Sequence, residues 1–149
     1  MKKPASLRAA LVAAIPSLAA EPDRLAVFID EGSIAATGGR SLSFEYRYTM
    51  HALVMDFAGD SDAVFVALVE WVRANQPDLV TNAGERGHGI TFEVDILNHT
   101  TVDLSVKLQL TEGVAVSTGA DGERVIGHVD DSQAGADRDF TWGAQTWTS

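Results

Sequence analysis

The longest regular pattern in the chain is an alternation of apolar and polar residues over positions 42–54. The apolar members are Leu42, Phe44, Tyr46, Tyr48, Met50, Ala52 and Val54. Strict alternation predicts a β-strand with one packed face and one face toward water or a partner. Near Leu53 three consecutive apolar residues break the alternation, and Phe57 follows. This change predicts that the far end of the strand is covered on both faces, and a bulge is one way to achieve it.

An amphipathic helix is predicted directly after this strand. Gly59 and Asp60 end the strand, Asp60 or Ser61 can cap the helix, and the carboxylate of Asp62 suits its positive end. The apolar stripe at helical spacing consists of Val64, Phe65, Leu68, Val69, Trp71 and Val72. Pro77 ends the helix.

A second, short helix is predicted near the N-terminus. Its apolar residues, spaced by four, four and three, are Leu7, Leu11, Ile15 and Leu18, and Pro16 bends or ends it. The segment also resembles a signal peptide, but Arg8 interrupts its apolar run and Pro16 shortens it, so we do not expect one. No apolar run in the sequence approaches the ~20 residues that span a bilayer.

Further strands are predicted on either side of these elements. Residues 25–29 alternate and end at Asp30-Glu31-Gly32, which predicts a hairpin turn with 33–37 as the returning strand. Residues 90–110 predict a second hairpin with a turn centred on Thr100, so that Glu93 faces Lys107. Its inward pairs would be Ile96 with Leu104, Val94 with Val106, and Phe92 with Leu108. Residues 114–116 and 124–129 predict two more short strands.

This order of elements predicts an α+β fold, in which a mostly antiparallel or mixed β-sheet packs against two α-helices. One domain is expected over residues 1–129. From Asp130 the periodicity stops, and we expect residues 130–149 to form an extended C-terminal arm. Phe140, Trp142 and Trp147 lie in this arm without a core to bury them, which favours a role as interface anchors.

Composition limits the partners. Twenty-one acidic residues against eleven basic ones give a formal net charge of −10, which argues against general binding to nucleic acid or to an anionic membrane. The absence of cysteine excludes disulfides and thiolate metal sites.

Candidate chemistry is sparse. His99 lies in the predicted turn near Asp95 and Asp103, and together with Glu93 these residues could form a small metal-binding hydrolase site. The alternative is a set of solvated carboxylates on the wet face of a hairpin. Phe44, Tyr46 and Tyr48 could stack on single-stranded nucleic acid, but they share a face with core residues. No nucleophile elbow or phosphate-binding loop is present, and no cofactor is expected.

Three stretches carry a resemblance to a known family. They are KKPASLRAALVAAIPSL…PDRLAVFIDEGSIAATG, SLSFEYRYTMHALVMDFAGD and GITFEVDILNHTTVDLSVKLQLTE. In this order they resemble the tail completion protein R family of contractile-tailed phages and related prophages. The resemblance covers residues 1–112, is most specific at FEYRY and DFAG, and does not extend to the residues from about Asp130.

The resemblance implies a structural tail terminator that is not an enzyme. It implies a ring of copies, typically a hexamer, at the head-proximal end of the tail tube, where it stops tube polymerisation and enables head–tail joining. The implied partners are the tail tube protein and sheath, neck or head-completion proteins, with genomic DNA passing through the lumen unbound and no membrane involved. The implied location is the virion tail, after assembly in the host cytoplasm.

Residue patterns add candidate contacts to this picture. Long alternating strands can extend a sheet across a subunit boundary, and a ring pairs each exposed edge with the next subunit. We therefore expect ring contacts through the strands at 41–57 and 90–110. The candidate interface residues are Glu45, Arg47, Glu93, Lys107, Phe140, Trp142 and Trp147.

Overall fold

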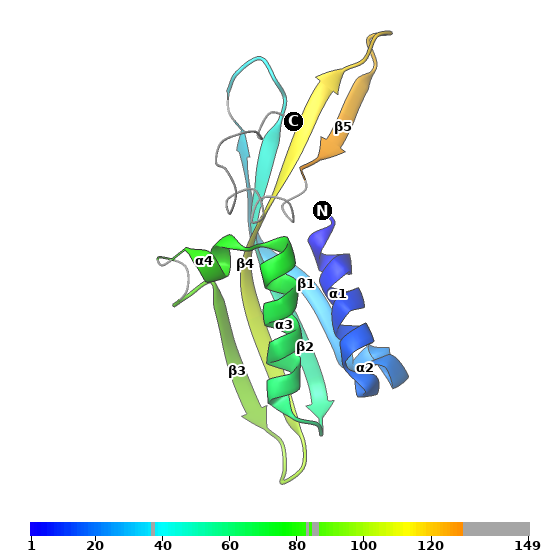
Figure 1. Cartoon of the computed structure of the whole chain (residues 1–149), viewed down its shortest axis with the longest axis vertical. Coiled ribbons are helices and arrows are strands. Elements are labelled where there is room, and N and C mark those ends of the chain that lie inside the picture. The colour runs from blue at the N-terminus through cyan, green and yellow to red at the C-terminus, as the bar shows by residue number, and fades with distance from the viewer. Residues whose placement is uncertain (37, 83, 85–86, 130–149) are drawn as a thin grey trace.

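The computed structural model describes residues 1–36, 38–82, 84 and 87–129 of the chain. Its helices are α1 (Lys3–Ala14), α2 (Pro16–Ala20), α3 (Ser61–Asn75) and α4 (Asp78–Thr81), with a 3-10 turn, η1 (Pro22–Arg24), before the first strand. Its strands are β1 (Leu25–Ala36), β2 (Phe44–Phe57), β3 (Ile90–Ile96), β4 (Val102–Thr118) and β5 (Arg124–His128). The predicted α+β class is confirmed (Figure 1).

All five strands form one antiparallel sheet in the order β1-β2-β4-β3. Strand β5 pairs with the last residues of β4, on the edge of β4 that faces away from β2. Strands β3 and β5 therefore follow one another along the same edge of β4. Strand β2 lies inside the sheet between β1 and β4, so the predicted strand at 41–57 offers no free edge to another subunit.

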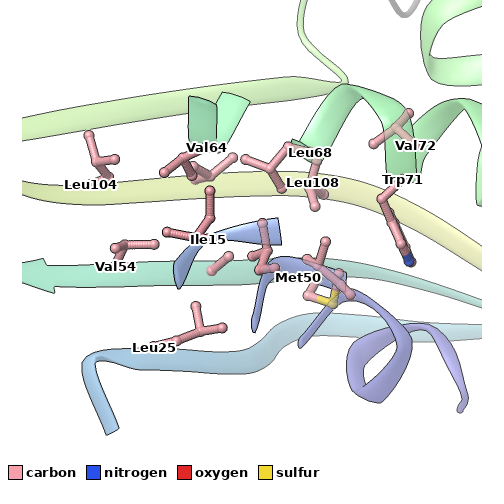
Figure 2. Close-up of a cluster of buried hydrophobic side chains, with 14 of the residues drawn as sticks. Ile15, Leu25, Met50, Val54, Val64, Leu68, Trp71, Val72, Leu104 and Leu108 are labelled. Atoms are coloured by element: carbon pink, nitrogen blue, oxygen red, sulfur yellow. The ribbon is translucent and has the colours of Figure 1, made fainter. Parts of the chain in front are cut away.

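Helices α1 and α3 cover one face of the sheet and form the core with it (Figure 2). The four apolar residues of the predicted N-terminal stripe are all buried, which confirms that stripe. Asp60 caps α3 by accepting a hydrogen bond from the amide of Asp62. The buried face of α3 is narrower than predicted, because Val69 is 42% exposed and Phe65 is only half-buried.

The predicted hairpin at residues 25–37 is wrong. Strand β1 pairs with β2 on both sides of Asp30-Glu31-Gly32, and these residues form a bulge in one continuous strand. One extra residue on β1 fits opposite β2, with Glu31 in the left-handed region at φ 53°. Before the bulge, odd-numbered residues such as Val27 and Ile29 point to the helix side of the sheet, and after it even-numbered residues such as Ile34 do. In the sequence this change in the alternation looks like the end of a strand.

The bulge indicated at the end of β2 is confirmed. Val54 pairs with Leu104 and Phe57 with Val102, so β2 holds one residue more than β4 over this stretch, and Asp56 lies at φ 52°. At the start of β2 the packed face was predicted too long, because Leu42 precedes the strand and is exposed.

The register predicted for the second hairpin is wrong by two residues. Val94 pairs with Leu104 and Phe92 with Val106, while Glu93 lies opposite Ser105 and Lys107 opposite Thr91. A shift of two keeps every side chain on its predicted face. The side-chain oxygen of Asn98 accepts hydrogen bonds from the amides at 100 and 101 and shapes a tighter turn than the one predicted. Residues 114–116 are not a separate strand but belong to β4.

One end of the sheet projects beyond the helices. We call this part the blade; it consists of residues 33–36, 44–47, 113–118 and 124–128. Figure 1 shows the core strands from left to right as β3, β4, β2 and β1, whereas the blade has β1 and β2 on the left and β4 and β5 on the right. The long, twisted strands therefore rotate the sheet so that the same face points in opposite directions in the core and in the blade.

Candidate assembly surfaces

The free strand edges of the described chain belong to β1, β3 and β5, because each of these strands pairs on one side only. Residues 115–118 of β4 add a further free edge, since they pair with β5 but not with β2. An unpaired edge exposes backbone N–H and C=O groups that can bind another strand. Of the two strands predicted to extend the sheet, the hairpin at 90–110 offers such an edge through β3, whereas β2 does not.

Four of the predicted interface residues lie on the face of the sheet that no described helix covers. Glu45 and Arg47 form an exposed ion pair at 2.8 Å along β2. Glu93 and Lys107 line a small hollow on the same side of the sheet, together with Ser105. The alternation of the strands therefore places the four on the same face of the sheet, with Glu45 and Arg47 in the blade and Glu93 and Lys107 in the core. Phe140, Trp142 and Trp147 lie outside the described residues.

Three residues of the hypothetical metal site, Glu93, Asp95 and Asp103, line one hollow, but they do not form a metal-binding group. Asp95 lies opposite Asp103 across the hairpin, and Asp103 accepts a hydrogen bond of 2.8 Å from the backbone amide of Asp56. Glu93 and Asp95 point from an exposed edge strand. No group of three or more histidine or acidic residues with metal-binding geometry exists among the described residues. Nothing in this arrangement supports the hydrolase hypothesis.

A buried polar cluster joins the N-terminus to the junction between core and blade. Glu112 is buried, and its carboxylate accepts hydrogen bonds from the amides of Lys2 and Lys3 at 2.7 and 3.3 Å and from the hydroxyl of Tyr48 at 2.5 Å. The carboxylate thus caps α1, which has no side-chain cap of its own at Lys2. Burial by itself raises the pKa of Glu112, but the hydrogen bonds from Tyr48 and the two amides outweigh it and lower the pKa below its ordinary value.

Two further side chains complete the cluster. The ammonium of Lys3 donates to the side-chain oxygen of Gln76 and to the backbone oxygen of Thr111, both at 2.6 Å. The amide of Thr111 donates to the same oxygen of Gln76 at 3.1 Å. Lys3 and Gln76 therefore supply hydrogen-bond partners for the backbone of Thr111, on the edge of β4 between its pairing with β3 and its pairing with β5. Sequence reasoning missed this cluster, since its members are far apart along the chain.

Among the exposed apolar side chains, one group lies on the blade and another on the outer side of α3. On the blade, Ile34 and Ile126 are more than half exposed. On the core, Val66 and Val69 lie on the outer side of α3, and the ring of Phe65 contacts that of Phe92 on β3. Exposed apolar patches of this kind mark contacts with other macromolecules.

No helix within the described residues is long and apolar enough to cross a membrane. The unpaired strand edges and the exposed apolar side chains on the blade and on α3 are typical of a structural protein that acts by assembly.

The comparisons with known proteins agree with this class. The model of the family described as P2 phage tail completion protein R (GpR) matches residues 1–132. The tail completion protein R of Escherichia phage P2 is 48% identical over 117 residues, which cover 78% of this chain and 76% of that protein. No solved structure matches the chain.

The chain therefore belongs to the P2 phage tail completion protein R family. The family is structural and not enzymatic, which confirms the resemblance and the expected absence of catalysis. Its place is the virion tail, where it interacts with other tail components.

Proposed function

We propose that copies of this chain form a terminator ring at the head-proximal end of the tail tube. The ring stops tube polymerisation and prepares the tail for joining to the head. A hexamer is the expected stoichiometry, because the family resemblance implies sixfold rings.

The observation that carries this proposal is the blade. Its strands continue the core sheet by residues 113–118 of β4 and by all of β5, and no described helix covers the face that carries Ile34 and Ile126. An apolar surface of this kind is unfavourable in an isolated protein, because it is exposed to water. Contact with another molecule removes it from water. A cyclic assembly supplies that contact for every copy and also pairs free edges.

The net charge of −10 supports a lumen through which DNA passes without binding. A basic lining would hold the phosphates through counterion release, whereas an acidic one repels them. Genomic DNA therefore passes through the ring without binding to it.

The further partners of the ring are the tube protein and sheath, neck or head-completion proteins. The pair Glu45 and Arg47 on the blade and the pair Glu93 and Lys107 on the core are polar groups that suit such contacts. The segment with Phe140, Trp142 and Trp147 supplies an arm to a further contact. Assembly takes place in the host cytoplasm, before the tail joins the head.

Imaging of tails that carry a labelled copy of this protein tests the proposal. We expect one ring per tail at the head-proximal end, and tubes of uncontrolled length when the protein is absent. Label along the whole tube, or none on the tail, would overturn the proposal.

A further inference from the structure

We propose that neighbouring copies in the ring contact each other head to tail, with the apolar face of one blade packed on the outer surface of α3 of the next copy. This inference rests on the proposed ring. It names the two surfaces that form each contact between copies.

The first surface is the face of the blade that continues the helix-covered face of the core. Ile34 pairs with Tyr46 across β1 and β2, and Val116 pairs with Ile126 across β4 and β5. Residues opposite one another in a ladder share a face, and Tyr46 lies two residues from the buried Tyr48. The face that α1 and α3 cover in the core is thus uncovered in the blade, where Ile126 is 62% exposed.

The second surface is a shallow hollow of about 830 Å³ along α3. Val66, which is 65% exposed, and Val69 form its apolar floor, and Asp62 and Glu70 lie beside them. A second hollow between α1 and α3, of about 640 Å³, shares Val66 and Glu70 with the first. The two hollows make a grooved, partly apolar surface on which the projecting side chains of a blade can pack.

Charge favours this pairing. Identical copies with a net charge of −10 repel one another, so a stable contact between them has to bring opposite charges together. Arg124 lies two residues from Ile126 on β5 and therefore points to the same face of the blade. Asp62 and Glu70 line the α3 hollow together with one cation, Arg73, so acidic groups outnumber basic ones there and supply the complementary charge.

The twist of the sheet gives the two surfaces the directions that a ring needs. In a head-to-tail ring each copy is rotated only modestly from the last, so the two contact surfaces of one copy must face roughly opposite ways. The strand order reverses across Figure 1 between core and blade, so the apolar face of the blade turns away from the side on which α3 lies. A flat sheet would instead direct both surfaces the same way.

Cysteine cross-linking in assembled tails tests the contact, because the chain contains no cysteine of its own. We expect the V66C/I126C double variant, oxidised in tails, to give a ladder of covalent multimers on a non-reducing gel. A mixture of V66C chains and I126C chains should stop at dimers, since each chain then carries one half of the contact. Either single variant alone should stay monomeric.

The matched control is V66C/V125C, which moves the second cysteine by one residue to the opposite face of β5. Val125 is also exposed, so a difference between the two double variants reports on the face and not on accessibility. Three results would overturn the proposed contact: equal ladders from both double variants, dimers from I126C alone, or no link in tails that carry the ring. Imaging of the same tails shows whether the ring is present. If the label is absent from the tail end, the proposed ring is wrong, and the proposed contact is wrong with it.

Discussion

The hydroxyl of Tyr48 on β2 donates a hydrogen bond of 2.5 Å to the carboxylate of Glu112 on β4. Both residues are buried at the point where the sheet leaves the helices and continues as the blade. The same carboxylate accepts the first amides of α1, so one acidic group connects the N-terminal helix to the two central strands. This contact therefore joins the start of α1 to the sheet at the junction between core and blade.

Replacing Glu112 with glutamine should destabilise the chain at neutral pH. The substitution removes the negative charge that caps α1 and weakens hydrogen bonds to a charged acceptor, a loss of about 1–3 kcal/mol in the free energy of unfolding. Urea denaturation of parent and E112Q measures it. E93Q, which changes an exposed carboxylate on β3, is the control and should have little effect.

The effect of E112Q should depend on pH. Because the folded-state pKa of Glu112 is lowered, its contribution to stability is present above the unfolded-state pKa, about 4.3, and is lost as pH falls through the lower folded-state value. The difference in stability between parent and E112Q should therefore stay constant down to the unfolded-state pKa of about 4.3 and shrink as pH falls from there through the folded-state pKa. A constant difference at lower pH would contradict the assignment.

Tyr48→Phe should cost about 1–3 kcal/mol, because it leaves the buried carboxylate without one of its donors. Tyr46→Phe changes the other tyrosine of the chain and should cost less, since Tyr46 lies in the half-buried part of β2. Thermal or urea unfolding of the two variants compares them directly. Equal losses in the free energy of unfolding would show that the hydrogen bond from Tyr48 to Glu112 does not contribute to stability.

The purified protein should show no appreciable affinity for duplex DNA at ~0.15 M salt, where the Debye length is ~8 Å. The physical reason is the net charge of −10, with no basic cluster beyond Lys2 and Lys3. The backbone amides of these two residues and the side chain of Lys3 are already hydrogen-bonded at the start of α1. A fluorescence titration measures this affinity. Micromolar binding under these conditions would refute the expectation of an unbound lumen.

Deleting residues 130–149 should leave the domain folded, since the core elements lie within residues 3–128. It should reduce incorporation into tails if the segment is a docking arm. W142A/W147A tests the aromatic anchors, with Q145A/T146A as a control in the same segment. Incorporation of W142A/W147A equal to that of the parent would show that the two tryptophans are not anchors.

The sequence by itself determined which side chains face the core. The alternation at Met50, Ala52 and Val54 and the spacing of Leu7 and Leu11 each identified a buried face, because the period of side-chain direction is a local property of strand and helix. The same alternation placed Glu93 and Lys107 on one face of the sheet, although it paired them wrongly.

Register and continuity were decided only by the tertiary structure. A register shift of two residues leaves every side chain on the same face, so the pattern could not distinguish Glu93 opposite Lys107 from Glu93 opposite Ser105. A bulge and a turn produce the same change of phase at Glu31, and only pairing with β2 on both sides shows that β1 continues.

The strand order, the blade and the polar cluster also came from tertiary structure. Lys2 and Glu112 are separated by 110 positions, and no local pattern brings a helix terminus to a distant carboxylate. The position of β2 inside the sheet depends on which strands find each other during folding, and the reversal between core and blade depends on twist accumulated along strands of 14 and 17 residues. Local periodicity determines which face of an element is packed, whereas long-range pairing and accumulated twist determine where that face points in the folded protein.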